Sequence, residues 1–213
     1  MNLAENRSGR SHAHGRRQKT PFISEVGLDG AASTDAGTQR EIFRSILALV
    51  ARTPRIISVH SKRATSQVLD LIEESVARGV VLHWWLGSQG ETKRAIGLGC
   101  VFSVNRSMDC AKLRSAGVPL GSLLPETDHP VGNRQGTDRR QPGWTSDVEQ
   151  AVAEAYGITT VEVRAQFWGT LAGLTQELDL DELFPRAVNA MLVAARSQPG
   201  GLGSTVISPE RPA

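Results

Sequence analysis

The sequence predicts an α/β fold in which short buried strands alternate with amphipathic helices. Hydrophobic residues make up 39% of the 213 residues but aromatic residues only 5%, a balance that favours Val, Ile, Leu and Ala packing in a parallel sheet. Apolar runs of four to six residues recur between helix-like stretches, and several end on a polar side chain. Such alternation indicates right-handed βαβ units. We expect five parallel strands, too few to close a barrel, for which about 250 residues are typical.

The chain divides into three parts. Residues 1–20 are basic and lack an acidic residue after Glu5, which predicts a disordered arm rather than a packed element. Residues 21–196 carry the alternating pattern and form the folded domain. Residues 197–213 are rich in glycine and proline and predict a disordered tail.

The first half of the domain begins with a strand over residues 22–27. A helix follows over 38–51, where apolar residues recur with helical spacing. Pro54 interrupts the chain before a strand over 56–60. The next helix spans 66–78 with Gly79 as its stop, and a strand covers 80–83.

The second half continues the alternation with a short helix over 91–98, a strand over 100–105, a helix over 108–116 and a strand over 122–128. The polar stretch 131–143, rich in Gly, Arg and Gln, predicts a loop. Helices over 144–156 and 160–178 follow, and 179–196 predicts another helix.

Composition excludes several classes of protein. The formal charge of +2 does not by itself indicate nucleic-acid binding. Cys100 and Cys110 fit no zinc or disulfide spacing and suggest a reducing compartment. The sequence contains no apolar stretch of the roughly 20 residues that a membrane span needs, and no signal peptide is evident. We therefore expect a cytoplasmic protein that does not contact membranes.

Four of the apolar runs end on, or directly before, a residue that binds metal ions. These residues are Glu25, His60, His83 and Asp128. The C-terminal ends of parallel strands meet at one edge of a sheet, where (β/α) barrels carry their active sites. Imidazole and carboxylate ligands suit zinc, manganese or iron, and carboxylates with water also hold magnesium. The sequence thus predicts a divalent-metal site at this edge.

Six segments carry a resemblance to a known family. They are Glu25–Asp29, His60–Ala64, His83–Gly87, Phe102–Val104, Leu124–Pro130 and Val163–Trp168. In this order and spacing the chain resembles the TatD-like metal-dependent deoxyribonucleases, a branch of the amidohydrolase superfamily. The resemblance implies a partial TIM-type (β/α) barrel, corresponding to about strands 4–8 of the family's eight. More narrowly, Gly27–Gly30 and Ser103–Asn105 resemble TatD-like subunits of bacterial anti-phage defence operons.

The resemblance also implies a ligand set. Glu25 would bridge two metal ions, His60 and His83 would complete one site, and Asp128 would bind the other ion and orient or deprotonate the attacking water. Two such ions would clamp a phosphodiester and stabilise charge on its leaving oxygen. Because one half of this set is complete, we expect one firmly held ion (Mg, Mn or Zn). A second ion would need ligands from water, substrate or another polypeptide.

The chain departs from the family at its N-terminal side. Family members begin with a strand that carries a His-x-His pair, followed by two further βα units. Here only 24 residues precede Glu25, so the resemblance places the start of the chain near the family's fourth strand. His12 and His14 have the right spacing but lie among small and basic residues, and we expect them to be solvated.

Three further residues are candidates for substrate binding. Arg63 is a candidate to bind a DNA phosphate through its guanidinium fork, and a charge on the helix surface is the alternative. Trp84 either stacks on a base or packs in the core. Glu126 accepts a hydrogen bond from substrate or from a ligand histidine. Asp29 more simply caps a turn, and Asn105 is a weak candidate for the same cleft.

Three functions remain open on this sequence. The first is metal-dependent, exonuclease-like hydrolysis of DNA from a free end or a nick. The second is a truncated or degenerate, non-catalytic subunit whose exposed sheet edges need a protein partner. The third is hydrolysis of another ester or amide with the same ligands, as in other amidohydrolases.

Overall fold

The computed structural model describes residues 20–132 and 142–197. The predicted basic arm with His12 and His14, and the predicted tail, lie outside these residues except for Thr20 and Ser197. Most of the predicted loop over 131–143 lies outside them as well.

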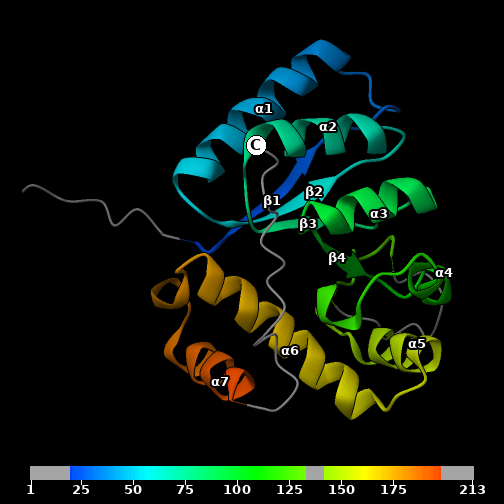
Figure 1. Ribbon diagram of the computed structural model, residues 1–213, viewed down its shortest axis with the longest axis vertical. Coiled ribbons are helices and arrows are strands. Elements are labelled where there is room, and N and C mark those ends of the chain that lie inside the picture. The colour runs from blue at the N-terminus through cyan, green and yellow to red at the C-terminus, as the bar shows by residue number, and fades with distance from the viewer. Residues whose placement is uncertain (1–19, 133–141, 198–213) are drawn as a thin grey trace, which may run out of the picture.

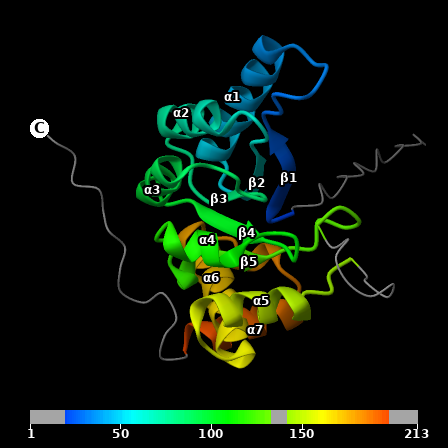
Figure 2. The ribbon, with the colours of Figure 1, turned by 90° about the vertical axis from the view of Figure 1, so that its right-hand side faces the viewer.

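Five parallel strands form one open sheet, as the sequence predicts. Their order is β1-β2-β3-β4-β5, so each strand pairs with its neighbours in the chain and β1 and β5 are the edges of the described sheet (Figure 2). The strands are β1 (Phe22–Gly27), β2 (Ile56–His60), β3 (Val80–Leu82), β4 (Val101–Val104) and β5 (Leu123–Pro125). All four pairings are parallel, which brings the C-terminal ends of all five strands to one rim.

Helices follow the strands in the order expected of βαβ units. They are α1 (Ala36–Arg52), α2 (Thr65–Ser75), α3 (Gln89–Gly97), α4 (Cys110–Ser115), α5 (Ser146–Tyr156), α6 (Thr160–Glu177) and α7 (Arg186–Arg196). Short 3-10 turns, η1 (Leu120–Ser122) and η2 (Asp181–Leu183), precede β5 and α7. Side-chain caps fix several starts: Asp35 accepts a hydrogen bond from the Thr38 amide at 2.8 Å, and Ser88 and Thr159 form capping boxes.

Two predicted helix boundaries differ from the structure by more than two residues. The second helix ends at Ser75, not at Gly79, because Val76 adopts a left-handed conformation with φ 51° and closes the helix. Gly79 instead has φ 74° and lies against the carbonyl of Arg55, where a side chain would collide. The predicted helix over 179–196 is split, since Pro185 precedes a helix that begins only at Arg186.

Apolar side chains cover both faces of the sheet. On one face, alternate strand residues such as Ile57, Val59 and Phe102 join the main core with the inner sides of α1, α2 and α5. On the other face, Ile56, Val81 and Val101 pack against Leu174 of α6 and against Leu178, which directly follows that helix. Figure 1 shows α1, α2 and α3 on one side of the strands and α6 with α7 on the other. Burial on both faces explains the nearly continuous apolar sequence of the strands.

The described helices are all too short or too polar to cross a lipid bilayer.

Candidate metal centre

Three of the four predicted ligands meet at the C-terminal rim of the sheet. Glu25 projects from β1, His60 ends β2, and His83 directly follows β3. Glu25 Oε1 lies 3.3 Å from His60 Nδ1 and 3.1 Å from His83 Nε2. One ligand atom from each residue lies within 4.8 Å of the others, which is a spacing that one metal ion can bridge. Parallel pairing places the ends of β1 and β2 side by side, with Gly27 opposite His60, and a register shift between Ile23 and Val26 includes Glu25.

Asp128, the fourth predicted ligand, lies at the edge of this cluster. Its Oδ1 is 3.8 Å from His83 Nε2. The residue follows β5 in a left-handed conformation with φ 41°, and its carbonyl accepts a hydrogen bond from the Gly132 amide at 2.7 Å. The turn therefore points the Asp128 carboxylate toward the same rim, beside the three-residue cluster.

Glu126 contacts the outer side of His83. Its Oε2 lies 2.7 Å from His83 Nδ1, while His83 Nε2 faces Glu25. Ser103 of β4 donates a hydrogen bond to the same Oε2, and Asn105 donates to Oε1 at 3.0 Å. A carboxylate behind a ligand histidine holds the ring orientation and leaves its other nitrogen free to bind metal. Of the two predicted roles for Glu126, the geometry supports the partner of a ligand histidine.

The electrostatics of the cluster follow from these contacts. The hydrogen bond between Glu25 and His60 lowers the pKa of the Glu25 carboxyl and raises the pKa of the His60 imidazole. Burial lowers the pKa of His83, but the hydrogen bond that its ring donates to Glu126 and the surrounding carboxylates outweigh it and raise that pKa overall. Burial raises the pKa of Asp128, with Glu126 and Glu25 adding to the effect.

The donor set fits a divalent metal ion. Two imidazoles and one carboxylate are ligands that zinc, manganese and iron accept, and a three-ligand site leaves positions open for water or substrate. The exposed fraction of the side chains falls from 41% at Glu25 to 12% at His83, so the site is open on one side and anchored in the protein on the other. The histidines and carboxylates of the site contact one another.

Comparison with known proteins identifies the family. The family model described as TatD related DNase matches residues 11–173, which is most of the chain. The chain belongs to the TatD-related DNase family. It is 31% identical to the human deoxyribonuclease TATDN3 over 150 residues, which cover 66% of this chain and 54% of that protein. It is 24% identical to YabD of Bacillus subtilis, described as a metal-dependent hydrolase, over 68% of this chain and 61% of that protein.

Solved TatD structures share the fold. The crystal structure of YjjV, a TatD homologue from Escherichia coli, aligns with a TM-score of 0.61 at 23% identity, covering 72% of this chain and 62% of that one. A TatD-family hydrolase from Entamoeba histolytica aligns with a TM-score of 0.60 at 19% identity. The chain thus spans between about half and two thirds of the length of these TatD relatives.

Gly27, the last residue of β1, and Asp29, two positions later, shape the His60 side of this TatD centre. Asp29 Oδ1 accepts a hydrogen bond from the Ala31 amide at 2.7 Å, which is the predicted turn role. Its Oδ2 also lies 3.3 Å from His60 Nε2, a contact that the sequence did not suggest. Gly27 pairs with His60 across β1 and β2 and has φ 140°, a conformation that brings it against the His60 carbonyl.

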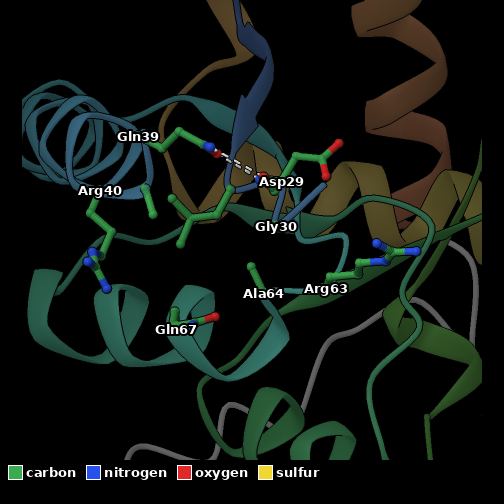
Figure 3. Close-up of a pocket in the computed structure, with 9 residues that line it drawn as sticks. Asp29, Gly30, Gln39, Arg40, Arg63, Ala64 and Gln67 are labelled. Atoms are coloured by element: carbon green, nitrogen blue, oxygen red, sulfur yellow. Dashed lines mark hydrogen bonds between the residues drawn. The ribbon is translucent and has the colours of Figure 1, made fainter. Parts of the chain in front are cut away.

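The two remaining substrate candidates lie in different settings. Arg63 is exposed and lines a small pocket of about 70 Å³ between α1 and α2. Figure 3 shows its side chain extending on the side of the Asp29 carboxylate, away from Arg40 and Gln67. Trp84 is half-buried and packs against the main core. Its role in base stacking therefore stays a prediction, as does phosphate binding by Arg63.

Sequence reasoning missed Ser103 and undervalued Asn105. Both are buried, at 5% and 0% exposure, and both donate hydrogen bonds to Glu126. A signal was present: Ser103 and Asn105 are polar residues two positions apart in an otherwise apolar strand segment, so they share one face. A buried polar side chain needs a partner, and the partner of both residues is Glu126, which directly follows β5.

Proposed function

We propose that this TatD-family chain hydrolyses phosphodiester bonds of DNA with a divalent metal ion, acting from a free end or a nick. The observation that carries the proposal is the convergence of Glu25, His60 and His83 beside Asp128 at one rim of the sheet. Family membership supports the reaction class, and the human relative is named a deoxyribonuclease. The proposal includes one firmly held ion of Mg, Mn or Zn and a cytoplasmic location, the latter resting on the two free cysteines.

The residues divide into holding and reacting groups. Glu25, His60 and His83 would hold the ion through Oε1 and the imidazole nitrogens that face it. Such an ion polarises a phosphoryl oxygen and lowers the pKa of water near it. The carboxylate of Asp128 stands next to His83 Nε2, where it can orient a water molecule or accept its proton. Arg63 would bind a phosphate from the exposed side of the rim.

A nuclease assay tests this proposal. End-labelled single- and double-stranded oligonucleotides are incubated with the protein and Mg²⁺, Mn²⁺ or Zn²⁺, and released nucleotides are counted. We expect metal-dependent release that Asp128→Asn abolishes. Asp70→Asn, which removes a carboxylate that pairs with Arg94 on the surface of α2, is the matched control and should leave release unchanged. Absence of release from folded, metal-loaded protein contradicts the proposal.

A second candidate function is a non-catalytic subunit that requires a protein partner. The supporting observation is that β1 and β5 are the edges of the described sheet, and an uncovered edge offers backbone groups for pairing with another chain. This function predicts self-association or a loss of solubility when the protein is isolated. A monomer in sedimentation that melts in one cooperative step would count against it.

A further inference from the structure

We propose that Ser103 and Asn105 are positioning residues for the metal centre. They fix the carboxylate of Glu126, and Glu126 in turn holds His83 with its Nδ1 protonated and its Nε2 directed at the metal position. The link to metal binding rests on the proposed function, whereas the effect on the His83 ring is a property of the protein alone.

The two ring nitrogens of His83 have different surroundings. A neutral imidazole carries one proton, and only the unprotonated nitrogen binds a metal. Glu126 Oε2 lies 2.7 Å from Nδ1, and a carboxylate at this distance favours the proton on Nδ1. Glu25 Oε1 also faces the ring, at 3.1 Å from Nε2, but the Glu126 contact is the shorter of the two and favours the proton on Nδ1, so that Nε2 faces the metal position beside Glu25.

Both carboxylate oxygens of Glu126 accept hydrogen bonds. Its side chain is only 14% exposed, so water alone cannot orient it. Oε2 accepts hydrogen bonds from Ser103 and from His83, and Oε1 accepts one from Asn105 at 3.0 Å. With a donor on each oxygen, the carboxylate plane is fixed, and a buried network of this kind is rigid only while every member is satisfied.

Asn105 is itself held by hydrogen bonds. Its Oδ1 accepts the Ser107 amide at 3.0 Å, which leaves its Nδ2 directed at Glu126. Ser107 donates through its amide and hydroxyl to the carbonyl of Gly132, at 3.1 Å and 2.8 Å. Gly132 donates to the carbonyl of Asp128 at 2.7 Å. One hydrogen-bonded path therefore joins the back of His83 to the turn that carries Asp128.

The test separates positioning from simple structural support. Ser103→Ala removes one donor to Glu126 without adding volume. Asn105→Asp keeps the oxygen that accepts the Ser107 amide but removes the donor to Oε1 and places two carboxylates together, which repel each other. The control is Thr170→Val, which removes a buried hydroxyl bonded to the Gly121 carbonyl, before β5 begins and thus at the opposite rim.

Two readouts are used for each variant. Nitrogen-15 NMR of labelled imidazoles in the metal-free protein at alkaline pH reports which nitrogen of His83 is protonated. Isothermal titration with Zn²⁺ and Mn²⁺ reports metal affinity. We expect the wild type and Thr170→Val to show the Nδ1–H form, and the Ser103 and Asn105 variants to show a mixture of both forms. Metal affinity should fall about tenfold in these variants, and about 10–100-fold in Glu126→Gln.

The outcomes are distinct. If folded Ser103→Ala and Asn105→Asp keep the wild-type His83 spectrum, the proposal is overturned, whatever their metal affinity. If Asn105→Asp does not fold, Ser103→Ala alone decides. If the wild type binds neither metal, the proposed function fails, while the imidazole spectra still support or overturn the positioning role.

Discussion

Gly27→Ala provides a sharp test of how β1 and β2 build the centre. Gly27 has φ 140°, which a residue with a side chain adopts at a cost of about 1–3 kcal/mol. A Cβ atom there would overlap the backbone carbonyl oxygen of His60, which cannot rotate away as a side chain would. That oxygen accepts a hydrogen bond from the Leu28 amide at 3.0 Å, whose loss costs about 1 kcal/mol more.

The expected destabilisation is thus about 2–4 kcal/mol. For a chain of this size it corresponds to a fall in Tm of about 5–15 °C, measured by calorimetry or circular dichroism. Because the carbonyl that must move belongs to His60 itself, Zn²⁺ affinity by titration calorimetry should fall at least about tenfold at a temperature where the variant is folded. Gly90→Ala is the matched control, since Gly90 lies in α3 with no atom within 4 Å of an added Cβ.

The control should leave Zn²⁺ affinity unchanged and should not lower the Tm, because alanine is the better helix former. A Gly27→Ala protein with wild-type Tm and wild-type metal affinity would refute the argument that the β1–β2 contact sets the position of His60.

Other predictions address pH, backbone strain and substrate. The contact with Glu25 raises the pKa of His60 above its ordinary 6.5, and a proton on His60 competes with a metal ion. Zn²⁺ affinity should therefore fall about tenfold per pH unit, for each proton displaced, as the pH drops through that raised pKa. Equal Zn²⁺ affinity at pH 8 and pH 6 would contradict this prediction. Val76→Gly should stabilise the protein by up to about 1 kcal/mol in chemical denaturation. Val76 is strained at φ 51°, and because its side chain is 82% exposed, little packing offsets that strain. A lower denaturation midpoint would argue against strain at this position. Arg63→Gln should raise KM for DNA more than it lowers kcat, whereas Lys93→Gln on α3 should change neither; an unchanged KM in the Arg63 variant would exclude phosphate binding.

The alternation of strands and helices could be predicted from the sequence because the local residue pattern and the tertiary packing favour the same structure. The central strands β2, β3 and β4 are largely buried on both faces, whereas β1 is only partly buried, so most of the strand sequences are short apolar runs that contrast with the amphipathic helices. The ends of the helices could be predicted less well. The end of α2 at Ser75 depends on a left-handed valine, a conformation that is unfavourable for this residue and that the sequence pattern therefore did not predict.

The sequence alone determined the fold class and which residues stand at the C-terminal ends of the strands. This follows from chemistry that is local: an apolar run closes on Glu25, His60 or His83, and parallel strands end at one rim. It could not say which side chains touch. Left-handed backbone at Trp84 and Asp128 redirects the chain just beyond the strands.

Only the tertiary structure decided which residues contact the metal ligands from behind, namely Glu126 and, through it, Ser103. Glu126 lies 43 positions from His83 in the sequence, yet their side chains are 2.7 Å apart because β4 separates β3 from β5 by a single strand and supplies Ser103 between them. Contacts of this kind depend on sheet order and on side-chain direction together. Neither is encoded in the residues near His83, so the sequence offered Glu126 as a partner of substrate or of a ligand histidine, and only the folded chain decided that the partner is His83.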